Sequence, residues 1–304
     1  MTRVRSLPAA ILVLLFLAGP VGATPFFFST GNPDGKIATA TRPEGAGKFE
    51  IESADDFVLT GPTTITGAKF TGLITGGATT ANIGEVRVEI YRVFPADSNV
   101  ARTSGPPTFS TPEVPTRVNS PSDVELADRD TAPPPGNLKF TTTVLSNIFT
   151  AANSVQPGGI HPIPGQTTGG NGSVTGQEVE FDVTFTTPFS LPPDHYFFVP
   201  QVEITTANGE FLWLSAPRPI VPPGTPFPLG FTDLQSWTRD DISPNNLVPD
   251  WLRVGADIVG PNPATAPTFN ATFSLTGDVP EPATWLLLGL GMVGVFGWRR
   301  IRKL

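Results

Sequence analysis

Hydrophobic and polar residues alternate with a period of two along most of this chain. In residues 178–185, for example, Val179, Phe181 and Val183 alternate with polar side chains. This period is typical of strands that have one face in a core and the other in water. The same pattern predicts strands at residues 48–52, 56–59, 64–74, 86–90, 138–144, 179–185, 196–204, 210–214, 252–258 and 269–275.

These strands, separated by turns rich in Gly, Pro and Asn, predict an all-β fold, namely a two-sheet β-sandwich of jelly-roll type. Residues 24–278 contain no convincing amphipathic helix pattern. Proline-rich loops at residues 104–136, 153–172 and 215–230 have strands of the same character on both sides. We therefore expect one domain over residues 24–278.

Residues 210–214 differ from the other predicted strands because both of their faces are apolar. Phe211 and Trp213 share one face, and Leu212 and Leu214 share the other. A strand of this kind is covered on both sides, so we expect it at the centre of a sheet with Trp213 in the core.

The N-terminus has the pattern of a secretory signal peptide. Arg3 and Arg5 precede an apolar run at residues 9–18, and small residues end at Ala23. We expect signal peptidase to cut after Ala23 and the rest of the chain to be exported.

The C-terminus, residues 279–304, begins with Pro280, Glu281 and Pro282 and continues with an uncharged apolar run. Arg299 and Arg300 open the basic end that follows this run. The run at residues 283–298 would span roughly 24 Å as a helix, somewhat less than the ~30 Å of a bilayer core. It predicts a single transmembrane helix with the basic end in the cytoplasm. On these grounds alone, a permanent C-terminal membrane anchor remains an alternative to a signal that is removed.

A Pro-Glu-Pro tripeptide ahead of a short apolar helix and an arginine cluster resembles the PEP-CTERM sorting signal of Gram-negative bacteria. The resemblance covers Pro280, Glu281, Pro282, the apolar run, Arg299 and Arg300. It implies that a membrane-embedded exosortase cuts near the tripeptide. The protein would then be anchored only transiently in the inner membrane before it reaches the cell surface or an extracellular matrix.

Charge and cysteine content narrow the classes of function. Without the six basic residues of the two ends, the chain has 13 Lys and Arg against 27 Asp and Glu, a net charge of −14. A nucleic-acid binder of the ordinary basic type is therefore excluded. The chain contains no cysteine, so it has neither disulfides nor thiolate chemistry. So acidic a domain is compatible with calcium as a cofactor.

Two adjacent carboxylate pairs are the candidate calcium ligands: Asp55 with Asp56, and Asp240 with Asp241. Oxygen ligands of this kind suit a hard cation. The alternative is that one residue of a pair caps a turn while the other is solvated. The run from Ser53 to Phe57 also resembles the opening of secreted bacterial β-sandwich domains, which implies a fold and no activity.

Other polar residues are expected to be structural or solvated. His161 lies in a predicted loop and His195 at the start of a predicted strand, without the spacing of a zinc motif. Glu178, Glu180 and Asp182 share a strand face, where a paired-carboxylate glycosidase site is the alternative to a solvated face.

Trp237 has polar neighbours on both sides, including Arg239 and Asp240. If it is exposed, its ring could stack on a sugar. Packing under a loop is the favoured alternative.

Two classes of function remain. We favour an exported, non-enzymatic surface or matrix protein whose partners are signal peptidase, an exosortase and an exopolysaccharide. The alternative is a secreted hydrolase or binding protein that acts on polysaccharide, because this fold class hosts both.

Overall fold

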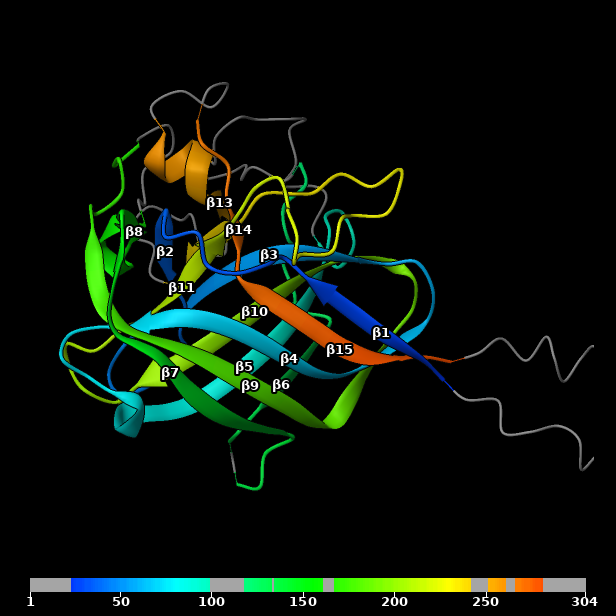
Figure 1. Cartoon of the computed structure of the whole chain (residues 1–304), viewed down its shortest axis with the longest axis horizontal. Helices are drawn as coiled ribbons and strands as arrows, with labels where there is room; N and C mark the ends of the chain where they lie inside the picture. Colours follow the sequence, from blue (N-terminus) through cyan, green and yellow to red (C-terminus); the bar gives the residue numbers. More distant parts are fainter. Residues whose placement is uncertain are drawn as a thin grey trace, which may run out of the picture.

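The computed structural model describes residues 23–98, 118–132, 134–160, 167–241, 251–260 and 266–280. In this part of the chain the strands form two sheets, which confirms the all-β, two-sheet prediction (Figure 1). His161, Glu281, Pro282, Arg299, Arg300 and the predicted transmembrane helix lie outside the described residues. None of the helical segments within these ranges has the length and apolar character needed to cross a bilayer.

The larger sheet has nine strands and is antiparallel except where β2 meets β8. Its main path runs β1-β15-β4-β11-β2-β8, while β9 pairs with β4, β7 with β9, and β14 with β11. The strands are β1 (Thr24–Ser29), β2 (Ile37–Ala40), β4 (Thr63–Ile74), β7 (Leu138–Ala151), β8 (Asn153–Val155), β9 (Val174–Leu191), β11 (Phe211–Ala216), β14 (Asn270–Ala271) and β15 (Phe273–Val279).

The smaller sheet has six antiparallel strands in the order β13-β12-β3-β10-β5-β6. They are β3 (Ile51–Leu59), β5 (Ile83–Arg92), β6 (Ala127–Asp130), β10 (Asp194–Ile204), β12 (Trp237–Asp240) and β13 (Leu252–Arg253). The residues that the structure describes also contain short helical segments, namely η1 (Thr80–Asn82), η3 (Pro157–Gly159) and η4 (Val254–Val259).

An aromatic core fills the space between the sheets. Phe70 and Phe181 of the larger sheet stack with ring centroids 4.9 Å apart. Phe198 of the smaller sheet stacks on Phe273 of the larger one at the same distance. Val179 and Val183, which the period-two pattern places on the same face as Phe181, are buried in this core as well. The apolar face predicted for residues 179–185 is therefore confirmed.

Strand β11 is covered on both faces, as predicted. Phe211 and Trp213 belong to the core between the sheets, whereas Leu212 and Leu214 belong to a second apolar cluster on the other face. Because β11 lies inside the path of the larger sheet, with β4 and β2 as neighbours, its backbone is paired on both sides as well.

The predicted strand at residues 252–258 is wrong beyond its first two residues. The chain leaves β13 and forms the π-helical turn η4, in which the buried carboxylate of Asp257 accepts hydrogen bonds from the backbone N–H and the guanidinium of Arg253. This local pairing turns the chain, so Val254, Ala256 and Ile258 are buried on a helical turn and not on a strand.

A second correction concerns residues 104–136, which were predicted to form a loop. This range contains strand β6.

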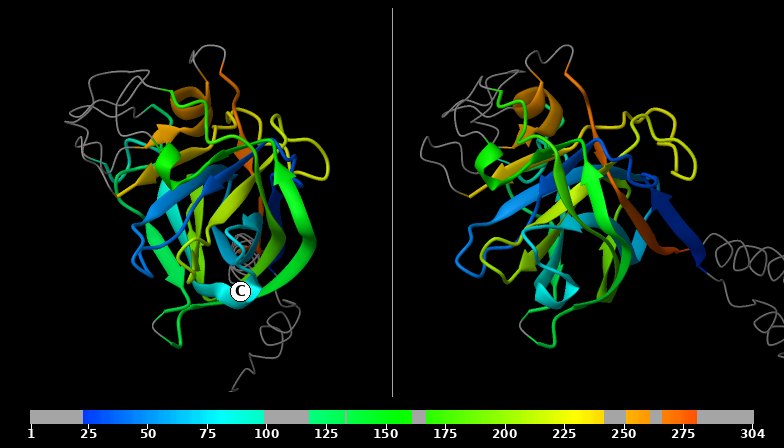
Figure 2. Two further views of the ribbon diagram at one scale, coloured as in Figure 1. Left: turned by 90° about the vertical axis from the view of Figure 1, so that its left-hand side faces the viewer. Right: turned by 60° about the vertical axis from the view of Figure 1, so that its left-hand side comes forward.

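The first and last strands of the domain lie side by side at an edge of the larger sheet. They pair antiparallel from Thr24 opposite Val279 to Ser29 opposite Ser274. Figure 2 (right) shows the blue first strand meeting the orange last strand. Both ends of the folded domain are therefore at one place on the molecule.

Candidate functional site

Strand β3 is buried along all of its nine residues, although it carries Glu52, Asp55 and Asp56. These three side chains are 6%, 1% and 1% exposed. Burying a carboxylate is costly unless protein donors replace water. The hydrogen bonds of these residues therefore decide what the cluster can do.

Asp55 connects the two sheets. Its Oδ1 accepts a hydrogen bond from Ser236 Oγ at 3.1 Å, and its Oδ2 accepts one from the backbone N–H of Ala271 in β14 at 2.8 Å. Burial, with a contribution from the neighbouring Asp56, raises the pKa of Asp55 well above its usual range. Oδ2 of Asp55 thus joins β3 to β14 of the larger sheet, and Oδ1 joins β3 to the residue that precedes β12.

Asp56 points to the opposite face of β3 and contacts His195 of β10. Its Oδ2 lies 2.6 Å from His195 Nε2 and accepts a second hydrogen bond from the backbone N–H of Leu234. Burial raises the pKa of Asp56 well above its usual value and lowers the pKa of His195 to about 4. The imidazole is therefore neutral at neutral pH, and one proton lies between the two residues. Asp56 Oδ1 has no hydrogen-bond partner in the described part of the chain.

The segment between β11 and β12 closes over the Asp56–His195 pair. Arg218 at its start donates to Asp233 Oδ1 at 3.0 Å and to Asn270 Oδ1 at 2.7 Å. The rings of Phe227 and Phe231 lie 6.0 and 6.1 Å from the His195 ring. The pair is consequently held under a loop.

Glu52 forms an ion pair with Arg239 of β12 on the same face. Arg239 Nη2 donates to Glu52 Oε1 at 3.0 Å, Nε donates to Oε2, and the Tyr91 hydroxyl donates to Oε1 at 2.5 Å. Burial opposes ionisation of Glu52, but the charge and hydrogen bonds of Arg239 outweigh it and hold the pKa of Glu52 below its usual value. The guanidinium also lies 4.4 Å from the centre of the Trp251 ring. A buried carboxylate whose charge is balanced by an arginine in this way stabilises the contact between strands β3 and β12.

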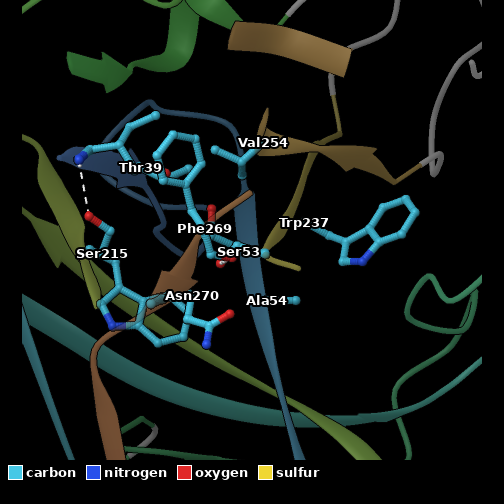
Figure 3. A pocket seen from close by; sticks show the side chains of 12 residues that line it. Thr39, Ser53, Ala54, Ser215, Trp237, Val254, Phe269 and Asn270 are labelled. Carbon is cyan, nitrogen blue, oxygen red and sulfur yellow. Dashed lines mark hydrogen bonds between the residues drawn. The ribbon is translucent and has the colours of Figure 1, made fainter. Parts of the chain in front are cut away.

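Trp237 packs in the apolar cluster on the outer face of the smaller sheet and is 1% exposed. The beginning of its side chain borders a cavity with a free volume of about 10 Å³, room for about one water molecule. Figure 3 shows the indole ring directed away from the other lining side chains, among them Ser53 and Asn270. A ring that stacks on a sugar must be exposed, so the burial of Trp237 fits the packing alternative that the sequence favoured and does not fit sugar stacking.

Asp240 is the last residue of strand β12, and Asp241 follows it at the surface. Burial, with a contribution from Asp241, raises the pKa of Asp240 to about 7. In the described ranges, no group of three or more His, Asp or Glu side chains could hold a metal ion. Three of the four carboxylate oxygens of Asp55 and Asp56 already have protein donors. Calcium at either pair stays a prediction.

Sequence reasoning missed the partners of the buried carboxylates. His195, Arg239 and Ser236 come from two strands and a loop that only the fold brings to β3. A usable signal was present in residues 51–59, where three acids interrupt a strand with apolar residues on both faces. On the other acidic strand, Lys69 lies 3.1 Å from Glu180 and 3.0 Å from Asp182, whereas Glu178 is buried, so the face expected to be solvated is covered at one of its three acids.

Comparison with known proteins identifies one feature of the chain. The family model described as the PEP-CTERM protein-sorting motif matches residues 278–303. No curated protein and no solved structure matches the chain. The matched segment overlaps the end of β15 and contains Pro280, Glu281, Pro282, Arg299 and Arg300. The chain therefore carries a PEP-CTERM protein-sorting motif that begins at the end of β15. This motif indicates an exported protein that is processed by an exosortase.

Proposed function

We propose that the chain is an exported, non-enzymatic protein of the cell surface or extracellular matrix, whose jelly-roll-type sandwich has a structural or binding role. The sorting motif at residues 278–303 is the observation that carries this proposal. Signal peptidase would remove residues 1–23, the tail would hold the protein transiently in the inner membrane, and an exosortase would release it.

The order of residues in the tail fits this route. Pro280 follows β15 directly and is exposed. Proline fixes φ and disfavours helix at the residue before it, so a Pro-Glu-Pro sequence favours the extended form in which proteases bind a substrate. The charges of Arg299 and Arg300 would stay on the cytoplasmic side, because moving them through hydrocarbon is costly.

The carboxylates of β3 support a non-enzymatic role. A glycosidase acts through two carboxyl groups that reach the substrate, at separations of about 5 to 10 Å. Glu52, Asp55 and Asp56 are instead buried and hold protein donors. Their charges and hydrogen-bonding capacity are used to join β3 to its neighbours.

The processing step is tested by mass spectrometry of surface material from a host that contains an exosortase. We expect a C-terminus within residues 280–284 for the wild type. Glu281→Ala, which alters the tripeptide, should reduce the processed fraction, whereas Lys139→Ala, on an exposed strand position, should not. Recovery of the wild type only as chains that end at Leu304 would contradict the proposal.

The non-enzymatic role is tested with the released domain and the polysaccharide of the host matrix. We expect the domain to produce no new reducing ends during prolonged incubation. An increase in reducing ends that depends on the domain would establish the hydrolase alternative.

A further inference from the structure

The two ends of the folded domain form one strand pair. β1 begins at Thr24, immediately after the signal-peptide cut predicted behind Ala23, and β15 ends at Val279, immediately before Pro280. Figure 1 shows β1 and β15 side by side, and in their antiparallel register Thr24 lies opposite Val279. Both predicted processing positions therefore border the same pair of strands.

β1 is the edge strand beside β15, and its pairing reaches one residue further toward the C-terminal end of β15 than the pairing of β4 does. The ladder of β15 with β4 ends at Asp278, opposite Thr64, whereas the ladder with β1 continues to Val279. Among the described strands, β1 is therefore the one that pairs with the last residue before the sorting tripeptide. Without β1, Val279 would have no strand partner on either side.

Phe28 is the most buried side chain of β1, and Phe26 packs partly against the same core. Phe28 is 4% exposed, and its ring lies 5.5 Å from Phe273 of β15 and 5.7 Å from Phe227 of the covering loop. Phe27, the preceding residue, points to the other face and is 57% exposed. Full burial of such a ring is worth about 1.5–3 kcal/mol, so Phe28 contributes far more to the docking of β1 than Phe27 does.

The stretch that a membrane protease can reach is short. Three residues, Pro280 to Pro282, separate the end of β15 from the predicted membrane run at residue 283. At about 3.5 Å per residue, three residues can span at most roughly 10 Å. A protease binds its substrate as an extended, unpaired segment, and residues inside a β ladder are not available in that form. The end of the β1–β15 ladder therefore sets the boundary of the accessible stretch on the domain side.

We propose that strand β1 is a positioning element for C-terminal processing: by pairing with β15 up to Val279, it confines the cut to the residues between the folded edge and the membrane. This inference rests on the proposed processing by an exosortase and adds the part that the folded domain plays in it. Antiparallel pairing also brings both chain ends to one side, so the sandwich can fold completely while both ends are still at the membrane.

The first test compares two neighbouring substitutions in the full chain, expressed in a host that contains an exosortase. Phe28→Ala removes the most buried ring of β1, and Phe27→Ala removes an exposed ring from the same strand. Intact-mass analysis of surface material should give one C-terminus within residues 280–284 for the wild type and Phe27→Ala. For Phe28→Ala we expect a mixture that includes C-termini before Pro280.

The second test leaves the β1–β15 pair intact, so its outcome does not depend on how well Phe28→Ala folds. Three residues, Gly-Ser-Gly, are inserted between Val279 and Pro280. If the folded edge sets the boundary, the insertion lengthens the accessible stretch, and we expect cuts within the inserted residues as well.

The outcomes separate this inference from the function on which it rests. A single unchanged C-terminus in both Phe28→Ala and the insertion variant, with normal processing of the wild type, would show that the motif alone selects the cut and would overturn only the role of β1. A wild type that is never cut would overturn the proposed processing, and the role of β1 with it.

Discussion

His195 Nε2 lies 2.6 Å from Asp56 Oδ2, and this contact joins strands β10 and β3 beneath the loop that leads to β12. Leu234 of that loop donates its backbone N–H to the same carboxylate oxygen. The pair thus anchors two strands and a loop at one point. Because Asp56 is buried, losing either partner leaves its carboxyl group desolvated and with fewer hydrogen bonds.

We expect His195→Gln to alter how stability depends on pH. Burial lowers the pKa of His195 to about 4 in the folded state, below the ~6.5 of an unfolded histidine. Between these values the unfolded chain binds the proton more tightly, so this residue contributes stability at neutral pH that is lost as the pH falls.

Glutamine keeps an N–H donor but does not titrate. The variant should therefore lose about 1 kcal/mol less of its unfolding free energy between pH 7 and pH 5 than the wild type does. Urea unfolding of the exported domain at the two pH values measures this difference, and identical losses would contradict the assignment.

Arg239→Ala should be among the most destabilising single substitutions in the domain. It leaves Glu52 buried without its cationic partner, which costs about 3–5 kcal/mol. Arg92→Ala is the matched control, because the Arg92–Asp97 pair lies near the surface and such pairs contribute about 0–1 kcal/mol. Denaturant unfolding of both variants checks the prediction, and similar losses in both would contradict it.

The elements that the sequence predicted well are those that a local pattern determines. Alternation located the strands around Val179 and Phe181, and the two apolar faces around Trp213 indicated a strand covered on both sides. The π-helical turn was missed because apolar residues two apart in 252–258 also fit a turn that a buried Asp257 holds to Arg253.

The candidate site was harder to predict, since its partners are far apart in the sequence. Glu52 meets Arg239, 187 residues away, and Asp56 meets His195, 139 residues away. Trp237 has polar neighbours in the sequence and is nevertheless buried, because strands β3 and β13 flank it and Trp251 lies in the same cluster. Contacts between residues so far apart in the sequence cannot be recognised from the spacing of neighbouring residues.

Gly72→Ala should destabilise the domain where β4 pairs with β11. A Cβ on Gly72 would overlap the ring of Phe211 and the carbonyl oxygen of Leu212. Overpacking of this kind costs about 1–3 kcal/mol or more. Gly158→Ala is the control, since a Cβ there meets no atom within 4 Å and the substitution should change stability by less than about 1 kcal/mol. Thermal melts distinguish the two, and equal midpoints would contradict the described packing.

Asp55→Ala should cost about 2 kcal/mol whether or not calcium is present. The substitution removes the acceptors of Ser236 Oγ and of the Ala271 N–H, and the cost of leaving such donors unpaired does not depend on a metal. Melts of residues 24–278 with millimolar calcium and with chelator test this. A loss seen only with calcium would instead assign a metal to Asp55.

Asp240 gives the opposite pH dependence to His195. Burial, then repulsion from Asp241, raises the pKa of Asp240 to about 7, against ~3.8 for the free side chain. The folded state therefore holds the proton more tightly than the unfolded state between these values. Its contribution to stability is complete below pH 4 and is lost as the pH rises through 7. Asp240→Asn removes this loss, because an amide does not titrate.

Asp240 is partly exposed, and solvent screening reduces the effect, so we expect the variant to be about 1 kcal/mol more stable than the wild type at pH 8 and equal to it near pH 4. Urea unfolding of the variant and of the wild type across pH 4 to 8 measures this difference. If Asp240→Asn followed the wild type over the whole range, the carboxyl of Asp240 would have to titrate at its ordinary pKa, and burial at the end of β12 would not control it.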